Sequence, residues 1–142
     1  LHEYAGYFII VLLLVRLLWG FIGSRHARFS DFVYSPEKIK VYAHDLIALR
    51  PGRYIGHNPL GGLMILVLMT TLMIASLSGI AAYGGELQGV YIEGSEFYEE
   101  IHEFFANLSL LLVAVHLLGV AVGSLLHHEN LVKAMLTGKK QA

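Results

Sequence analysis

The segment EEIHEFFANLSLLLVAVHLLG, residues 99–119, decides the fold class, because two histidines interrupt a run that is otherwise almost purely apolar. The apolar run continues to Leu126, and from Phe104 onward it contains no Asp, Glu, Lys or Arg. At ~1.5 Å of rise per residue, such a helix is long enough to cross a hydrocarbon core of ~30 Å. The segment therefore predicts a membrane-spanning helix with imidazoles at two depths.

Two further segments have the length and composition of membrane spans, and together the three cover about residues 4–23, 60–83 and 104–126. Only the first contains a charged side chain, Arg16. Hydrophobic residues make up 56% of the 142 residues, well above the usage of soluble domains. Three buried helices in a soluble protein of this size would leave too little polar surface to cover them. We therefore predict an all-α fold, a transmembrane helical bundle forming one membrane domain over residues 1–142.

Composition excludes several functions. The formal net charge of -1 gives no reason to expect a nucleic-acid partner. The absence of cysteine excludes disulfides, thiolate metal sites, cysteine-held iron–sulfur clusters and covalent c-type haem attachment. Any metal chemistry must therefore rest on histidine and carboxylate side chains. The sequence also begins at Leu1 without a methionine, and we expect it to be a fragment that lacks its N-terminal part.

The distribution of charge predicts the orientation, because Lys and Arg accumulate in short cytoplasmic loops. The connection 24–59 and the C-terminal tail hold all the basic residues outside the first span, which are Arg25, Arg28, Lys38, Lys40, Arg50, Arg53, Lys133, Lys139 and Lys140. The loop 84–101 has no basic residue and carries Glu86, Glu93, Glu96, Glu99 and Glu100. We therefore expect the connection and the C-terminus to be cytoplasmic and the loop to lie outside.

The cytoplasmic connection is predicted to contain an amphipathic helix over about residues 36–50. Ser35 is a candidate N-cap, Pro36 suits the first helical position, and Pro51-Gly52 is a stop signal. Its apolar face comprises Ile39, Tyr42, Leu46 and Leu49. Such a helix would lie along the inner membrane surface. The segment ENLVKAMLTGKK after the third span is expected to be a second, shorter interfacial segment.

The spacing of the histidines indicates cofactor binding. His102 and His116 are fourteen residues apart, which on a helix is ~1400° of rotation, about 40° short of four turns, and ~21 Å of rise. They share a face but cannot bind one metal ion, because metal–nitrogen bonds are ~2 Å long. They could serve two cofactors stacked across the membrane, such as haems that each take two axial imidazoles from facing helices. His2, at the outer end of the first span, is the expected partner of His102, whereas His116 has no partner within the spans.

Arg16 lies fourteen residues after His2, so it faces the same way and reaches roughly the depth of His116. Two interpretations remain open for it. A buried guanidinium could pair with the carboxylates of haem propionates. Alternatively, the side chain could extend to the cytoplasmic headgroups, ~10 Å away.

The other histidines have simpler interpretations. All fall in cytoplasmic connections or at the end of a span, where solvated or interfacial imidazoles are expected, and they are His26, His44, His57, His127 and His128. For His44 and His57, a place in the lining of a quinone pocket is an alternative. Glycines such as Gly6, Gly20 and Gly79 would allow close packing around flat cofactors, although small residues are common wherever membrane helices meet.

An ordered set of motifs covers nearly the whole chain. In order, they are LHEYAGY (1–7), RLLWGFIGSRHARFSDF (16–32), HNPLGG (57–62), IHEFFANLSLLLVAVHLLGV (101–120) and HHENLVKAMLTGKK (127–140). Together they resemble the bacterial cytochrome b561 and nickel–iron hydrogenase b-type cytochrome family. The ordered set is far more specific than any single histidine.

The resemblance implies a four-helix membrane protein that holds two b-type haems through pairs of histidines. Residue by residue, it implies that His2 and His102 hold the periplasmic-side haem and that His116 is one ligand of the cytoplasmic-side haem. The fourth ligand is then expected on a first helix that precedes the LHEYAGY motif and is absent from this sequence. This agrees with the expectation drawn from Leu1, and three spans of a four-helix bundle are present.

The function expected from these features is electron transfer between a periplasmic redox partner and the quinone pool, in a respiratory chain of the bacterial inner membrane. Because protein ligands fill both axial positions, oxygen binding at the iron is disfavoured. The partner implied by the family is a hydrogenase, a c-type cytochrome or another periplasmic reductase, and superoxide oxidation is a further possibility. The chain is expected to be a membrane anchor and electron conduit more than a self-sufficient enzyme.

Two alternatives belong to other functional classes. The first is a haem-free membrane protein in which His2, His102, His116 and Arg16 form a proton or ion path. Such relays normally include Asp or Glu within the spans, and here the carboxylates stop at the outer interface. The second is a purely structural membrane anchor, which explains the hydrophobicity but not the histidines on one face. Haem stoichiometry separates both alternatives from the main prediction.

Overall fold

The computed structural model describes residues 1–50, 52, 54, 56–87, 95–126 and 133. Within these residues every regular element is helical. In chain order they are α1 (His2–Ile22), the 3-10 turn η1 (Arg25–Ala27), α2 (Phe29–Phe32), α3 (Pro36–Ile47), α4 (Pro59–Leu87) and α5 (Ser95–Leu126). Helices α1, α4 and α5 are long and apolar enough to cross a membrane. The predicted all-α fold with three candidate spans is thus confirmed.

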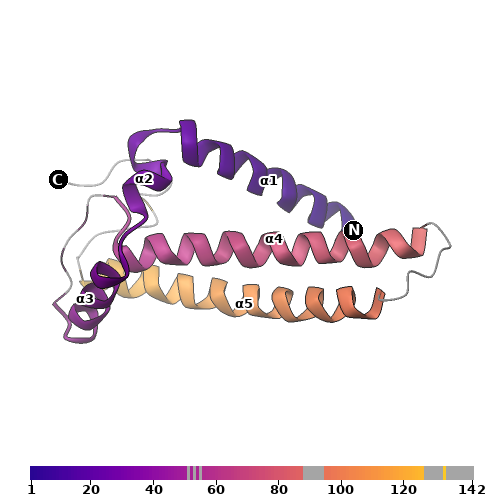
Figure 1. The fold of residues 1–142 in the computed structure, drawn as a ribbon. Helices are drawn as coiled ribbons and strands as arrows, with labels where there is room; N and C mark the ends of the chain where they lie inside the picture. The colour runs from indigo at the N-terminus through magenta and orange to yellow at the C-terminus, as the bar shows by residue number, and fades with distance from the viewer. Residues whose placement is uncertain (51, 53, 55, 88–94, 127–132, 134–142) are drawn as a thin grey trace.

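The three long helices form an open bundle (Figure 1). Helices α4 and α5 run antiparallel and pack side by side along most of their length. Helix α1 approaches this pair at its N-terminus and slopes away from it toward its C-terminus. We call the end where α1 begins the histidine end, because His2 and His102 meet there, and the opposite end, which carries η1, α2 and α3, the connection end.

Helix α5 begins at Ser95, before the predicted start of the span at residue 104. The added turns are polar and mostly exposed, and Glu96 lies in the first turn. Acidic side chains are favourable there because the first turn of a helix carries a partial positive charge. The extension matters for the site, because His102 lies about two turns inside a continuous helix and its direction is set by that helix.

The HNPLGG motif builds the start of α4. The Asn58 side-chain oxygen accepts a hydrogen bond from the backbone N–H of Gly61 at 2.7 Å, which is the geometry of an N-cap. Pro59 occupies the first helical position and is fully buried. Gly62 lies so close to the backbone carbonyl of Phe32 that a β-carbon could not fit. The motif thus starts the helix and anchors it against α2.

Helix α3 starts at the predicted place but ends earlier than residue 50. Ser35 is its N-cap by position, although its hydroxyl makes no capping hydrogen bond. The helix ends at Ile47, and Leu49 has a positive φ of 55°. The N–H of Leu49 then bonds the carbonyl of Leu46, and the N–H of Arg50 bonds that of Asp45. This is a Schellman ending, which usually places glycine where Leu49 stands.

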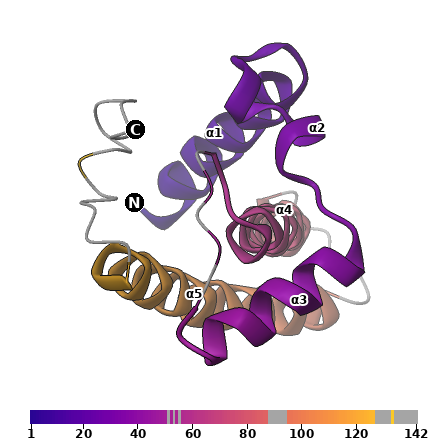
Figure 2. The ribbon, with the colours of Figure 1, turned by 90° about the vertical axis from the view of Figure 1, so that its left-hand side faces the viewer.

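The apolar face of α3 is only partly as predicted. Tyr42 is buried, and Ile39 and Leu46 are half-buried, but Leu49 lies beyond the helix and is 70% exposed. Helix α3 lies across the end of the α4–α5 pair (Figure 2). Apart from Lys133, the second interfacial segment predicted over residues 129–140 lies outside the described residues, as do His127 and His128.

Candidate functional site

The imidazoles of His2 and His102 lie together at the histidine end. Their ring centroids are 5.7 Å apart and their planes are inclined by 86°. The two residues come from different helices, α1 and α5, and are one hundred positions apart in the sequence. Two imidazoles bound to opposite sides of one metal ion, each through a bond of ~2 Å, have centroids roughly 6 Å apart. The separation of this pair therefore fits two axial ligands.

A hydrogen bond to the backbone of α4 sets the tautomer of the neutral His102 ring. Its Nδ1 lies 2.7 Å from the carbonyl oxygen of Ala75. A carbonyl oxygen only accepts hydrogen bonds, so the imidazole must donate, and Nδ1 carries the proton. In the neutral ring the other nitrogen, Nε2, then has a free lone pair. Histidines that bind metals commonly donate their second N–H to a backbone carbonyl in this way.

Gly79 provides the space for the His102 ring. A β-carbon at Gly79 would lie 2.9 Å from Nδ1 and 3.0 Å from Cε1 of His102. Gly79 follows Ala75 by one helical turn, so both lie on the same face of α4. The ring is thus held by a carbonyl that orients it and a glycine that lets it approach. The imidazole from α5 fits in this place because position 79 of α4 is glycine, and a larger residue at that position would have no room.

His116 lies on the same continuous helix as His102 and is half-buried. The helix carries it ~21 Å further toward the connection end at ~1.5 Å per residue. Within the part of the chain that the structure describes, no hydrogen bond, ion pair or ring contact is recorded for its imidazole. The structure thus brings His2 and His102 together, and among the residues it describes it brings no second histidine to His116.

The guanidinium of Arg16 is directed to the connection end. Its Nη1 donates a hydrogen bond to the carbonyl of Ala27 at 3.2 Å. Its central carbon lies 5.4 Å and 5.5 Å from the ring centroids of Phe29 and Phe32, within the range of cation–π contacts. Arg16 therefore links α1 to η1 and α2, which follow it in the chain.

A polar cluster lies beside Arg16 at the connection end. His26 is exposed and its Nδ1 lies 2.9 Å from a carboxylate oxygen of Asp31. His57 is half-buried and its ring packs 5.1 Å from that of Phe32. Its buried Nδ1 has no hydrogen-bond partner among the described residues. Burial, followed by the nearby Arg16 charge, lowers the pKa of His57 below its ordinary value. Of the solvated and interfacial environments that the sequence suggested for His57, the half-buried ring fits the interfacial one.

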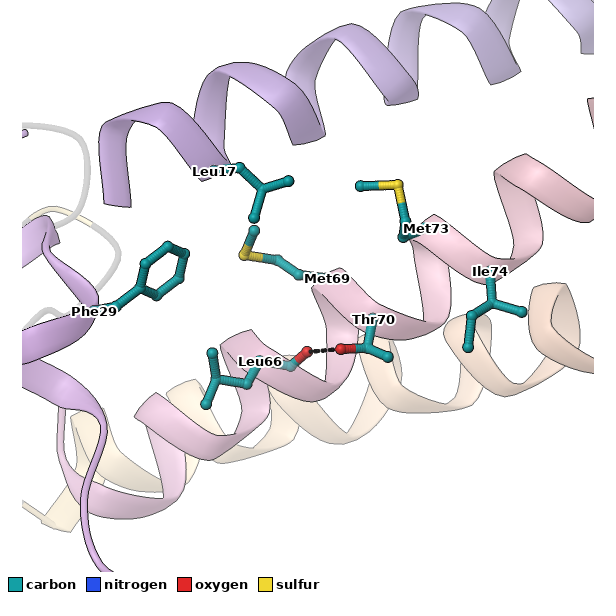
Figure 3. A pocket seen from close by; sticks show the side chains of 7 residues that line it. All are labelled: Leu17, Phe29, Leu66, Met69, Thr70, Met73 and Ile74. Carbon is teal, nitrogen blue, oxygen red and sulfur yellow. Dashed lines mark hydrogen bonds between the residues drawn. The ribbon is translucent and has the colours of Figure 1, made fainter. Parts of the chain in front are cut away.

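A hollow of about 330 Å³ lies between α1 and α4 (Figure 3). It is lined by Leu17, Phe29, Leu66, Met69, Thr70, Met73 and Ile74. The hydroxyl of Thr70 donates to the carbonyl of Leu66 at 2.9 Å, so the polar group in this lining is already paired. Within the described ranges, no three His, Asp or Glu side chains lie close enough together to hold a single metal ion.

Sequence reasoning missed two parts of the histidine site. The carbonyl of Ala75 belongs to the backbone, so no residue pattern indicates it. Gly79 was visible as one of several glycines in the spans, but nothing in the sequence connects it to His102. The one sign in the sequence that Gly79 and His102 could meet is that both lie near the predicted outer ends of their spans, the second and the third.

A family model described as prokaryotic cytochrome b561 matches residues 1–138. Among curated relatives, proteins named probable Ni/Fe-hydrogenase B-type cytochrome subunit are 22% identical in Rhizobium leguminosarum bv. viciae and 24% identical in Cupriavidus necator. These alignments cover 99% and 96% of this chain and 67% and 64% of the relatives. A relative of the same name from Azotobacter vinelandii is 34% identical over 58% of this chain and 38% of its own length. Nearly all of this chain aligns with these two relatives, and it spans about two thirds of their length. No solved structure matches it.

Proposed function

Because the chain belongs to the prokaryotic cytochrome b561 family, we propose that it is a membrane b-type cytochrome that carries electrons between a periplasmic redox partner and the quinone pool. The observation that carries this proposal is the meeting of His2 and His102 at ring-centroid separation 5.7 Å. Two helices far apart in sequence bring two imidazoles to the spacing of axial ligands. A purely structural anchor does not require this arrangement.

His2 and His102 are the proposed axial ligands of one b-type haem, at the histidine end. His116 is the proposed ligand of a second haem, whose other ligand we expect from outside these 142 residues. Haem iron supplies reversible one-electron oxidation and reduction. The ~21 Å of helix between His102 and His116 spaces the two sites across most of a hydrocarbon core of ~30 Å.

The chain contributes orientation and electrostatics to these sites. In the neutral ring, the bond from His102 Nδ1 to the Ala75 carbonyl leaves the proton on Nδ1 and the lone pair of Nε2 available to iron. Arg16 uses one nitrogen on the Ala27 carbonyl, and a guanidinium has five N–H donors in total. We propose that its remaining donors face a haem propionate of the second site, where a charge-assisted pair would be favourable.

The proposed orientation places the connection end in the cytoplasm and the histidine end at the periplasmic face of the bacterial inner membrane. The basic residues of the connection support it, because Lys and Arg favour the cytoplasmic side. The names of the relatives support a hydrogenase as the periplasmic partner. In this assignment the chain is the membrane subunit, and the partner holds any iron–sulfur cluster.

The test is a pyridine haemochrome assay with protein quantified in parallel. The protein is expressed from its complete reading frame and purified from membranes. Three variants are compared with it, His102→Ala, His116→Ala and His44→Ala. His44 is a matched control because its side chain is 85% exposed on α3, a helix that carries none of the proposed ligands.

We expect two b-type haems per chain in the parent protein and in His44→Ala. His102→Ala and His116→Ala should each lose one haem, and the two losses should differ in their absorption and redox properties. A parent protein without haem would contradict electron transfer and favour the proton-path alternative. Loss of both haems in His44→Ala would contradict the ligand assignment.

A further inference from the structure

The Ala75 carbonyl oxygen receives two side-chain contacts. His102 Nδ1 lies 2.7 Å from it, and the hydroxyl oxygen of Ser78 lies 3.0 Å from it. The same hydroxyl lies 2.8 Å from the carbonyl oxygen of Ile74. Ala75 and Ser78 are 7% and 6% exposed, so bulk water does not compete for these bonds. The proton of Ser78 can therefore be directed to either of two carbonyls, and one of them also orients His102.

We propose that Ser78 is a positioning residue, an inference that rests on the proposed function. Its hydroxyl weakens the His102–Ala75 hydrogen bond and thereby raises the reduction potential of the haem held by His102. A carbonyl oxygen has two lone pairs. In a continuous α-helix, one is used by the backbone N–H four residues later, here that of Gly79. The Nδ1–H of His102 and the hydroxyl of Ser78 share the other lone pair of the Ala75 oxygen, and each donor reduces the electron density available to the other.

The sign of the effect follows from ligand basicity. A hydrogen bond from the distal N–H of a metal-bound imidazole makes the ring a more basic ligand, and hydrogen bonding around the ligands is one way a protein sets a haem potential. A more basic ligand favours the oxidised, more positively charged iron. When the Ser78 hydroxyl donates to the Ala75 oxygen, the hydrogen bond from His102 to that oxygen weakens. The imidazole is then a less basic ligand, and the reduced iron is less disfavoured. Removing the hydroxyl should reverse this change.

The substitution Ser78→Ala is a mild one for the fold. It removes a donor without leaving a buried group unpaired, because the carbonyls of Ile74 and Ala75 keep their helical partners. Ser109 offers a matched control on the facing helix. It is 5% exposed, and within the part of the chain that the structure describes its buried hydroxyl has no hydrogen-bond partner. Ser109→Ala therefore removes the same atom without touching the Ala75 oxygen.

The test is a spectroelectrochemical redox titration of the full-length, haem-loaded protein and of Ser78→Ala, Ser78→Thr and Ser109→Ala. The haem held by His102 is identified by its loss in His102→Ala. We expect Ser78→Ala to shift the midpoint potential of this haem to a more negative value and to leave the second haem unchanged. Ser78→Thr, which keeps the hydroxyl, and Ser109→Ala should match the parent protein.

Three results would overturn the role of Ser78. They are an unchanged or more positive potential in Ser78→Ala, an equal shift in Ser109→Ala, and a potential in Ser78→Thr equal to that of Ser78→Ala. Any of them would leave the electron-transfer proposal intact, since the haems would still be present and redox-active. Absence of haem from the parent protein would instead contradict the proposed function itself.

Discussion

Gly79 of α4 lies directly against the imidazole of His102 of α5, at a distance that leaves no space for a β-carbon. An alanine methyl there would lie 2.9 Å from Nδ1, the atom that bonds the Ala75 carbonyl. We therefore expect Gly79→Ala to displace the ring and to weaken binding of the haem at the histidine end. Loss of groups that orient a metal ligand typically costs roughly 10–100-fold in affinity. Haem titration of the apoprotein, followed by absorbance, measures the change.

The control for this substitution is Gly119→Ala. Gly119 also lies in a spanning helix, and a β-carbon on it would meet nothing within 4 Å. Because Gly119 lies seventeen residues from His102 along α5, the affinity of this variant for the haem at the histidine end should equal that of the parent protein. Unchanged affinity in Gly79→Ala would show that the His102 ring has room to move and still bind.

Asn58→Ala is expected to destabilise the protein by about 1 kcal/mol, the typical cost of losing an N-cap. The substitution leaves the Gly61 N–H without its partner at the start of α4. Asn58→Asp should retain most of the stability, because a carboxylate also accepts this bond. Denaturant unfolding in detergent micelles, followed by circular dichroism, gives the free energies. Asn107→Ala, an exposed change on α5, is the control, and an equal loss there would argue against the capping role.

Leu49→Gly is expected to stabilise the protein by about 1 kcal/mol. Leu49 has a φ of 55°, and the left-handed conformation costs residues with a side chain roughly 1–2 kcal/mol relative to glycine. The same change at Val41, which is 61% exposed in the middle of α3, should instead cost roughly 0.5 kcal/mol, because valine is itself a weaker helix former than alanine. Opposite signs in the same unfolding assay would establish the Schellman ending. Two losses would refute it.

Acidification is expected to destabilise the connection end through His57. Its folded pKa lies below the ordinary value of 6.5, so the unfolded chain binds the proton more readily. Stability linked to this residue is therefore complete above pH 6.5 and falls as the pH drops through the unfolded and then the folded pKa. Protonation would also place a donor on the buried Nδ1 of His57, for which the described residues offer no acceptor.

The measurement is the melting temperature in detergent between pH 7.5 and pH 5, for the parent protein, His57→Gln and His44→Gln. The decrease on acidification should be smaller in His57→Gln than in the parent protein. His44→Gln removes an exposed imidazole and should retain the parent's pH dependence. Identical slopes in all three proteins would exclude His57 as the sensitive group.

The amino-acid sequence by itself determined the helical class, the three candidate spans and the positions of His2, His102 and His116 along their helices. Membrane-spanning helices can be predicted in this way because their formation depends on the local composition of about twenty consecutive residues. The depth of a histidine then follows from the constant rise of the helix. Helix ends were less predictable. Charged residues continued α5 beyond its apolar run, and Leu49 took a conformation that is usual for glycine.

Only the tertiary structure decided which atoms meet at the site. The His102–Ala75 hydrogen bond and the close approach of Gly79 depend on how far α4 and α5 are rotated about their axes and how closely they pack. The direction of Arg16 depends in the same way on where η1 and α2 fold back against α1. Side-chain packing between residues distant in the chain sets these quantities. Local hydropathy and helical periodicity carry no information about a backbone carbonyl on a neighbouring helix.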